Sequence, residues 1–134
     1  MAQLCMAEQI RVILTILSLA DELLTQNLDF MTPENAIKIL SNPLRVAVLQ
    51  WLKQPEVAFA DYQQLYDFSE YGVCASLIQK KAGLSQPATS LLLKSLSDGS
   101  LVTPVKIGKW TYYKSNNKNI REMSAQVIEY VNNI

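Results

Sequence analysis

Apolar residues recur at helical spacing through the first thirty positions. Over residues 10–28 they fall on two faces of a helix, with Ile10, Ile13, Leu14, Leu17, Leu24 and Leu28 on one face and Val12, Ile16, Leu19 and Leu23 on the other. A helix with two apolar faces is expected to bury both of them. One face can pack against its own domain, and the other favours a partner chain. We therefore predict a dimerisation helix in residues 1–30, with a purely intramolecular helix and a membrane-surface helix as the alternatives.

The same segment lacks the pattern of a targeting or membrane-spanning sequence. The apolar run from Val12 to Ala20 is too short to cross a bilayer. Glu8 stands where a signal peptide carries basic residues, and Arg11 interrupts the apolar stretch. The sequence therefore predicts a soluble, cytoplasmic protein without membrane contact.

Two short helices are predicted next. Thr32 can cap the first one, which ends near Asn42 because that residue precedes a proline. The second helix runs from Leu44 to Lys53. Because a new helix start follows residue 30, residues 31–134 are predicted to form a complete domain and residues 1–30 an extension of it.

Residues 56–72 are rich in aromatic and acidic side chains. Tyr62, Leu65 and Tyr66 have helical spacing, which predicts one or two turns of helix. Four acidic residues make the segment a poor phosphate binder. We interpret it as a surface loop packed by its own aromatic residues, with an effector pocket or a partner surface as the alternative.

The second half of the chain combines helices with a β-hairpin. A short helix from Val73 to Lys81 ends at a glycine, and a second helix, capped by Ser85, extends to about Ser97. Two β-rich runs, 101–103 and 110–113, flank a glycine tip, and a helix over 120–131 follows. The predicted fold class is α+β and mostly helical: a winged helix-turn-helix with an extra N-terminal helix and a C-terminal helix for dimerisation.

Charge is distributed unevenly although the net charge is zero. Residues 1–78 hold 4 basic and 9 acidic residues, whereas residues 79–121 hold 8 basic residues and a single aspartate. A basic block favours a polyanionic partner, and a solvated surface is the alternative. A chain of 134 residues with 49% apolar and only 18% charged residues is also expected to bury surface in an oligomer.

The chain has no histidine, which excludes several classes of site. The commonest metal ligand and the commonest general acid–base group at neutral pH are both missing. Two cysteines are too few for a disulfide-stapled secreted scaffold. Because no paired carboxylates form a catalytic motif either, we predict no enzymatic activity and no cofactor.

A winged helix-turn-helix places its second helix in the major groove of DNA and its hairpin along the backbone. The expected contacts lie on the outward face of that helix and at the hairpin tip: Ser85, Gln86, Ser90, Lys94, Lys106 and Lys109. Ser85 is expected to leave helix amides facing phosphate, and Gln86 can pair with adenine. The lysines suit phosphates, for which Lys80 and Lys81 are further candidates.

Three short motifs occur in the chain at separations that make their combination more specific for one protein family than any single motif is. They are Asn42-Pro43-Leu44-Arg45, Ala82-Gly83-Leu84-Ser85-Gln86-Pro87-Ala88-Thr89-Ser90 and Gly108-Lys109-Trp110-Thr111-Tyr112-Tyr113-Lys114. The combination resembles the ArsR (arsenic repressor) family of bacterial transcription regulators. The resemblance covers about residues 32–132 and implies a dimeric winged-helix repressor that acts on operator DNA.

The chain departs from the metal-sensing members of that family. Those members carry Cys-x-Cys at the start of the helix before the turn, where this chain has Cys74-Ala75-Ser76. Others bind metal through histidine and carboxylates on the last helix. The resemblance therefore implies a member that does not sense metal. Cys74 is interpreted as a small buried hydrophobic residue, with a redox-responsive thiol and a metal ligand as the alternatives.

The recognition helix departs from the family as well, because Leu91 and Leu92 stand where Arg or His is usual. Apolar periodicity would bury Leu91 and expose Thr89, whereas the family alignment predicts the reverse. We follow the alignment because the core residues Leu93 and Leu96 lie nearer to Thr89. Leu91 then joins the DNA contacts as a partner for a thymine methyl group, or it marks a helix that binds protein.

These observations together predict a homodimer that binds double-stranded operator DNA and represses transcription in response to an unknown effector. The alternative is a winged-helix protein-interaction module that has lost specific DNA binding. Leu91, Leu92 and the zero net charge favour that alternative.

Overall fold

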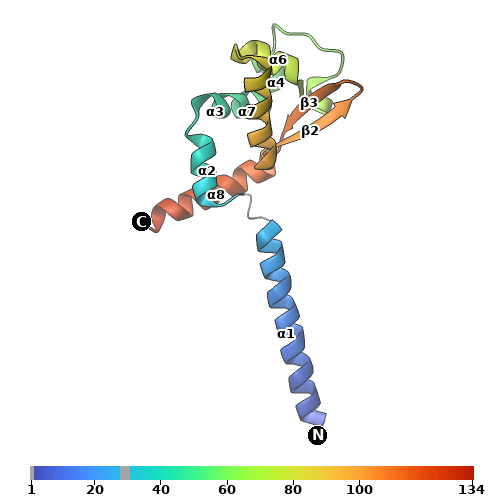
Figure 1. Cartoon of the computed structure of the whole chain (residues 1–134), viewed down its shortest axis with the longest axis vertical. Helices are drawn as coiled ribbons and strands as arrows, with labels where there is room; N and C mark the ends of the chain where they lie inside the picture. Colours follow the sequence, from blue (N-terminus) through green and yellow to red (C-terminus); the bar gives the residue numbers. More distant parts are fainter. Residues whose placement is uncertain (1, 28–30) are drawn as a thin grey trace. The chain divides into compact units, whose positions relative to one another are not determined.

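The computed structural model describes the backbone of residues 2–27 and 31–134 and the side chains of residues 7–19 and 31–134. The chain divides into two compact units, Met1–Phe30 and Met31–Ile134. The described backbone of the first unit is one helix, α1 (Ala2–Asn27), as the apolar pattern predicts (Figure 1). Leu28 and the side chains of Leu23 and Leu24 lie outside the described residues. No second described element in this unit covers the apolar faces of α1, and its part in dimerisation stays a prediction.

Side-chain caps begin the first two helices of the second unit. α2 (Pro33–Leu40) follows Thr32, whose Oγ1 accepts a hydrogen bond from the amide three residues later at 3.2 Å. α3 (Pro43–Lys53) follows Asn42, whose Oδ1 accepts from the amide two residues later at 3.0 Å. Each cap satisfies an amide that has no partner inside its helix. The predicted break between the two helices is therefore confirmed.

The segment after α3 is a loop that holds two short helices, α4 (Pro55–Ala58) and α5 (Phe68–Tyr71). Phe59 is fully buried at its centre. The ring centroids of Trp51, Tyr62 and Phe68 lie 6.2, 5.6 and 6.1 Å from that of Phe59. The prediction that the segment packs on its own aromatic residues is confirmed.

The helical turns predicted over residues 62–66 are wrong, because this stretch has no regular secondary structure. Gln64 provides the physical reason. Its side-chain Nε2 donates to the carbonyl oxygens of Tyr66 and Gly72, at 2.9 and 2.7 Å, and its Oε1 accepts from the Cys74 amide at 2.9 Å. One side chain thus satisfies three backbone groups without a helix.

The described residues form one antiparallel sheet in the order β1-β3-β2, with β1 (Val73–Cys74), β2 (Val102–Ile107) and β3 (Trp110–Ser115). The prediction that Val73 and Cys74 begin a helix is wrong, because they pair with Tyr113 and Tyr112 of β3. β2 extends beyond the predicted run and includes Pro104. It is an edge strand, where the missing N–H of a proline costs no ladder hydrogen bond.

The remaining helices complete a winged helix-turn-helix (Figure 1). α6 (Ala75–Ala82) and α7 (Gln86–Asp98) are the helix pair, and the β2–β3 hairpin is the wing. α8 (Asn117–Asn132) packs on α2 and begins three residues earlier than predicted, because the Asn116 side chain caps it. Apolar side chains from across this unit share one buried core, which includes Val48, Ile78, Leu93, Leu96 and Leu101. The predicted α+β fold class is confirmed.

None of the helices in the described part of the chain combines the length and the apolar character that crossing a bilayer requires.

We expect Gly72→Ala to destabilise the fold far more than Gly83→Ala. Both glycines have positive φ, +85° and +67°. Gly83 is in the left-handed helical region, which costs an alanine about 1 kcal/mol, whereas Gly72, with ψ −158°, is in a region that only glycine normally adopts. A Cβ on Gly83 would meet open space, whereas a Cβ on Gly72 would overlap the Tyr113 carbonyl oxygen. Urea unfolding at one protein concentration should show a loss of about 1 kcal/mol for Gly83→Ala and about 3 kcal/mol for Gly72→Ala. Equal losses would contradict the close approach of Gly72 to the backbone of β3.

Candidate nucleic-acid interface

The turn between α6 and α7 sets the direction of α7. α6 ends at Gly83, whose left-handed conformation turns the chain and whose amide donates to the Gln79 carbonyl at 3.0 Å. Ser85 then caps α7, because its Oγ accepts from the Ala88 amide at 3.3 Å. The predictions that the first helix ends at a glycine and that Ser85 caps the second are both confirmed.

Ser85 leaves fewer helix amides free to face phosphate than expected. Among the first three residues of α7, Pro87 has no N–H and the amide of Ala88 is taken by Ser85. Of these three, Gln86 alone has an amide without a partner among the described residues. A phosphate at this end of α7 can therefore receive one backbone hydrogen bond, and further affinity has to come from side chains.

One face of α7 is exposed and polar. Gln86, Ser90 and Lys94 are exposed on it, as predicted. Thr89 is 4% exposed and Leu91 is 70% exposed, which confirms the assignment from the family alignment rather than the one from apolar periodicity. Thr89 is held inward because its Oγ1 donates to the Ser85 carbonyl at 2.9 Å.

A groove of about 640 Å³ lies between the helix pair and the wing. Its lining brings together residues from α7 and from the hairpin tip that the sequence had singled out: Gln86, Ser90, Lys94 and Lys109. Ser85, Leu91 and Lys106 lie outside this lining. The groove therefore has a lysine on each of two different elements, with polar side chains between them.

Several residues of the groove were not predicted from the sequence, and two of them have side chains suited to polar or aromatic contacts. Gln79 of α6 and Trp110 of β3 both line it. Trp110 is about half exposed, and the Nζ of Lys109 lies 5.5 Å from the centroid of its ring. The position of Trp110 beside the hairpin tip is a signal that could have identified it. Gln79 could not have been identified, because its place depends on the angle between α6 and α7.

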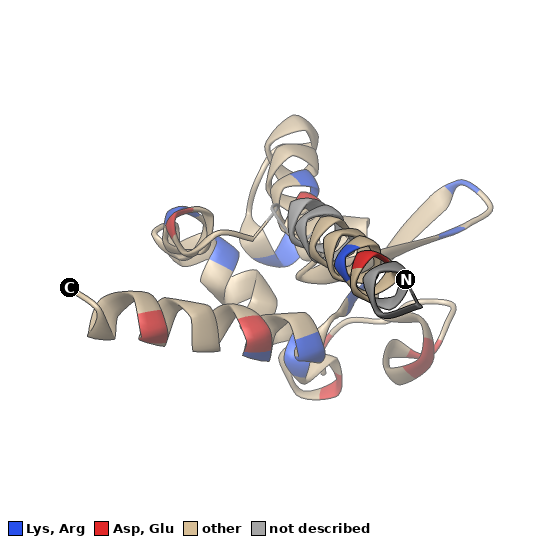
Figure 2. Ribbon diagram, turned by 90° about the horizontal axis from the view of Figure 1, so that it is seen from below, with Lys and Arg blue, Asp and Glu red and all other residues tan. Residues whose placement is uncertain are grey.

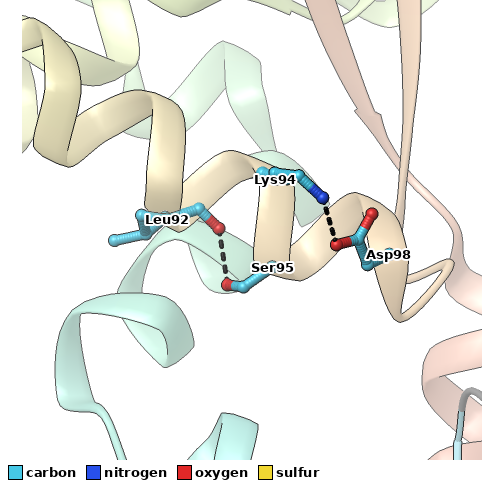
Figure 3. A network of polar contacts seen from close by, with 4 residues as sticks. All are labelled: Leu92, Lys94, Ser95 and Asp98. Atoms are coloured by element: carbon cyan, nitrogen blue, oxygen red, sulfur yellow. Dashed lines mark hydrogen bonds and ion pairs between the residues drawn. The ribbon is translucent and has the colours of Figure 1, made fainter.

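Lys94 forms an ion pair with Asp98, one turn further along α7, with 2.8 Å between Nζ and Oδ2 (Figure 3). Both side chains are largely exposed, and a helical pair of this kind contributes only about 0.3–0.5 kcal/mol. A phosphate can therefore compete with Asp98 for the ammonium group of Lys94.

The wing carries positive charge without any acidic residue (Figure 2). Its charged side chains are Lys106, Lys109 and Lys114, and all three are exposed. In contrast, α8 carries charges of both signs. Exposed cations on a hairpin next to a groove are suited to contact phosphates.

Lys81 has a different partner from the phosphate expected for it. Its Nζ lies over the rings of Trp51, Phe59 and Tyr62, at 5.2, 5.6 and 6.0 Å from their centroids. These cation–π contacts hold the ammonium group against the aromatic cluster beside α4 and α5. Lys80, its neighbour, is exposed.

Cys74 is buried, with 6% of its surface exposed, and its Sγ accepts a hydrogen bond from the Ser76 hydroxyl at 3.2 Å. It lies opposite Tyr112 in the sheet. Burial raises the pKa of the Tyr112 phenol, and the nearby Cys74 and Tyr66 raise it further. The predicted burial of Cys74 is confirmed. Within the described residues, no group of three or more His, Cys, Asp or Glu is placed to hold a metal ion.

Comparison with known proteins gives one informative relative. No family model matches the chain. The chain is 37% identical over 94 residues to a protein of Bacillus subtilis (strain 168) described as the uncharacterized HTH-type transcriptional regulator YbzH. The alignment covers 70% of this chain and 93% of that relative. With the winged helix-turn-helix fold and the groove beside its recognition helix, this similarity shows that the chain belongs to the family of helix-turn-helix-type transcriptional regulators.

Proposed function

We propose that the protein is a repressor of the ArsR type that binds double-stranded operator DNA as a homodimer and senses no metal. The groove between α7 and the wing is the observation that carries this proposal, because it gathers polar and cationic side chains from two elements. The relative that is a helix-turn-helix transcriptional regulator supports the same function. The motifs over residues 42–45, 82–90 and 108–114 support the ArsR type.

The recognition helix would supply the base contacts. Gln86 stands at the exposed first position of α7, where its amide can pair with an adenine in the major groove. Ser90 lies one turn further along the same face, within reach of a base edge or a phosphate. Leu91 presents an exposed apolar side chain that suits a thymine methyl group. Ser85 contributes indirectly, because its cap fixes the start of the helix.

The lysines would hold the DNA backbone. Lys94 and Lys109 line the groove from the helix and from the wing, so a strand that enters it would meet a cation from each element. Lys106 lies across the hairpin from Thr111 and adds a further exposed cation to the wing. Contacts of this kind position the protein without selecting a sequence.

A homodimer is supported by apolar surface on both units. α1 has two apolar faces, and no other described element of its own unit covers them. On α8, Ile128 and Val131 are exposed, and Val127 beside them is only partly buried. Burying both surfaces against a second copy would remove them from water. A two-fold dimer would also present two recognition helices to two half-sites on DNA.

The exposure of Leu91 favours one second candidate function, a protein-interaction module. A leucine that is 70% exposed on a recognition helix is also suited to an apolar partner surface. Under this alternative the wild-type protein binds DNA weakly and without sequence preference.

We expect Lys106→Ala and Lys109→Ala each to weaken binding to all DNA sequences. Each substitution removes about one phosphate contact, so the slope of log affinity against log salt should become shallower by about 0.9. Fluorescence anisotropy titrations at several salt concentrations measure this slope. Lys38→Ala, which changes an exposed lysine of α2 outside the groove, is the matched control and should leave the slope unchanged. An unchanged slope in both wing variants would show that the wing lysines do not contact DNA.

Gln86→Ala should weaken binding to the preferred site alone. Losing an amide that pairs with adenine should cost about 1–3 kcal/mol on a site selected from a random duplex library, with little change on random DNA. Gln63→Ala, at an exposed position in the loop before α5, is the control. An equal loss on selected and random DNA would make Gln86 a backbone contact.

Substitutions of Leu91 separate the two candidate functions. If α7 binds DNA, Leu91→Arg should tighten binding to all sequences and Leu91→Asp should weaken it, because they add opposite charges next to phosphates. Leu65→Asp, at an exposed leucine of the loop, is the matched control. If Leu91→Asp instead leaves DNA binding unchanged and abolishes capture of a protein partner, the interaction module is correct.

Ile128→Asp combined with Val131→Asp should convert a dimer into a monomer, because it places two charges in an apolar contact. Sedimentation at micromolar concentration should show about twice the 15.1 kDa chain mass for the wild type and the chain mass for the variant. Gln126→Asp, at an exposed position on the opposite face of α8, is the control. A wild-type protein that sediments only as a monomer would disprove the homodimer.

A further inference from the structure

A second pocket, about 340 Å³ in volume, lies where α2, α3 and α8 meet. Its wall is mainly apolar and consists of Leu40, Val46, Leu49, Ile120 and Met123. Leu49 and Met123 are part of the buried core, so the floor of the pocket is firmly held. The volume lies at the lower end of the range of small-molecule sites, roughly 300–1,000 Å³.

Two cations stand at the edge of this pocket. Lys53 is the last residue of α3, and Arg121 lies in the second turn of α8. Gln50 and Asn117 add amide groups to the same lining. None of the described residues that line the pocket is acidic, and neither cation has a carboxylate partner within the described part of the chain. An apolar floor with a cationic rim is complementary to an amphipathic anion.

We propose that this pocket binds a small organic carboxylate with an apolar body, such as a medium-chain fatty acid, as the effector of the protein. The apolar body leaves water when it covers Leu49 and Met123. The carboxylate stays at the exposed rim, where Lys53 and Arg121 favour its charged form. The planar guanidinium of Arg121 is suited to bind both of its oxygens.

α8 connects this pocket with the elements that would act on DNA. It begins two residues after β3 ends at Ser115, and the Ser115 hydroxyl donates to the Asn117 Oδ1 at 2.9 Å. The same helix carries the exposed Ile128 and Val131. A ligand that favours one position of α8 therefore changes the wing or the dimer contact, and through them the affinity for DNA. This effect on DNA affinity rests on the proposed function, whereas ligand binding itself does not.

Ligand binding can be measured on the full chain without DNA. Octanoate is the probe, titrated by calorimetry, and octanol is the neutral control with the same apolar body. We expect saturable octanoate binding at one site per chain. Lys53→Gln and Arg121→Gln should each weaken it about fivefold, as expected for one exposed charge contact, and leave octanol binding unchanged. Lys118→Gln, on an exposed residue of α8 outside the pocket lining, should have no effect.

Two results would overturn the proposal: the absence of saturable octanoate binding, or an affinity that stays the same in both charge variants. Failure of the proposed function is distinguishable from both. If the wild type binds octanoate as expected but binds no duplex DNA, the ligand site stands and the repressor assignment falls.

Discussion

The pairing of β3 with both of its neighbours fixes the groove on which the proposed function depends. β1 lies on one side of β3 and leads directly into α6, while β2 lies on the other side and completes the wing. The wing is therefore joined to the helix pair by backbone hydrogen bonds, which do not depend on the identity of surface side chains. Gly72 makes this pairing possible, because any Cβ at that position would overlap the backbone of β3. The distance between the lysines of α7 and of the wing follows from this pairing.

Those parts of the fold that depend on short-range signals could be predicted from the sequence. Thr32 and Ser85 cap their helices through amides three residues away, and Gly83 ends α6 through its own left-handed backbone. Gly108 has φ +61° at the tip of the wing, as the hairpin pattern implies. Each of these residues acts within one helical turn or one tight turn, so its effect can be recognised without knowledge of the tertiary structure.

The errors arose where a distant partner decides the outcome. Val73 and Cys74 directly precede a helix, so the sequence pattern assigns them to its first turn. In the structure, pairing with β3 and a hydrogen bond from the Cys74 amide to the Gln64 side chain hold them in a strand. Lys81 belongs by sequence to the basic segment 79–121, but its ammonium group lies over aromatic rings from α3 and from the loop after it. The groove itself had no sequence signature, because it exists only after β1, β2 and β3 have paired.

Not all basic residues of segment 79–121 are placed to contact DNA in the folded domain, although the sequence groups them together. The 8 basic residues of segment 79–121 do not act together, since Lys81 is held by aromatic rings outside the groove lining. The wing lysines remain exposed, with no acidic residue on their hairpin. A site of this kind relies on a few phosphate contacts, and sequence preference then has to come from α7.

The fluorescence of Trp110 tests most directly whether DNA enters the groove between α7 and the wing. The chain has two tryptophans, so Trp51→Phe leaves Trp110, half exposed in the groove beside Lys109, as the single reporter. Adding a duplex selected from a random library should change its emission saturably, and salt should reverse the change in parallel with dissociation. If anisotropy shows binding of the same duplex while the emission of Trp110 stays constant, DNA binds elsewhere and the account is wrong.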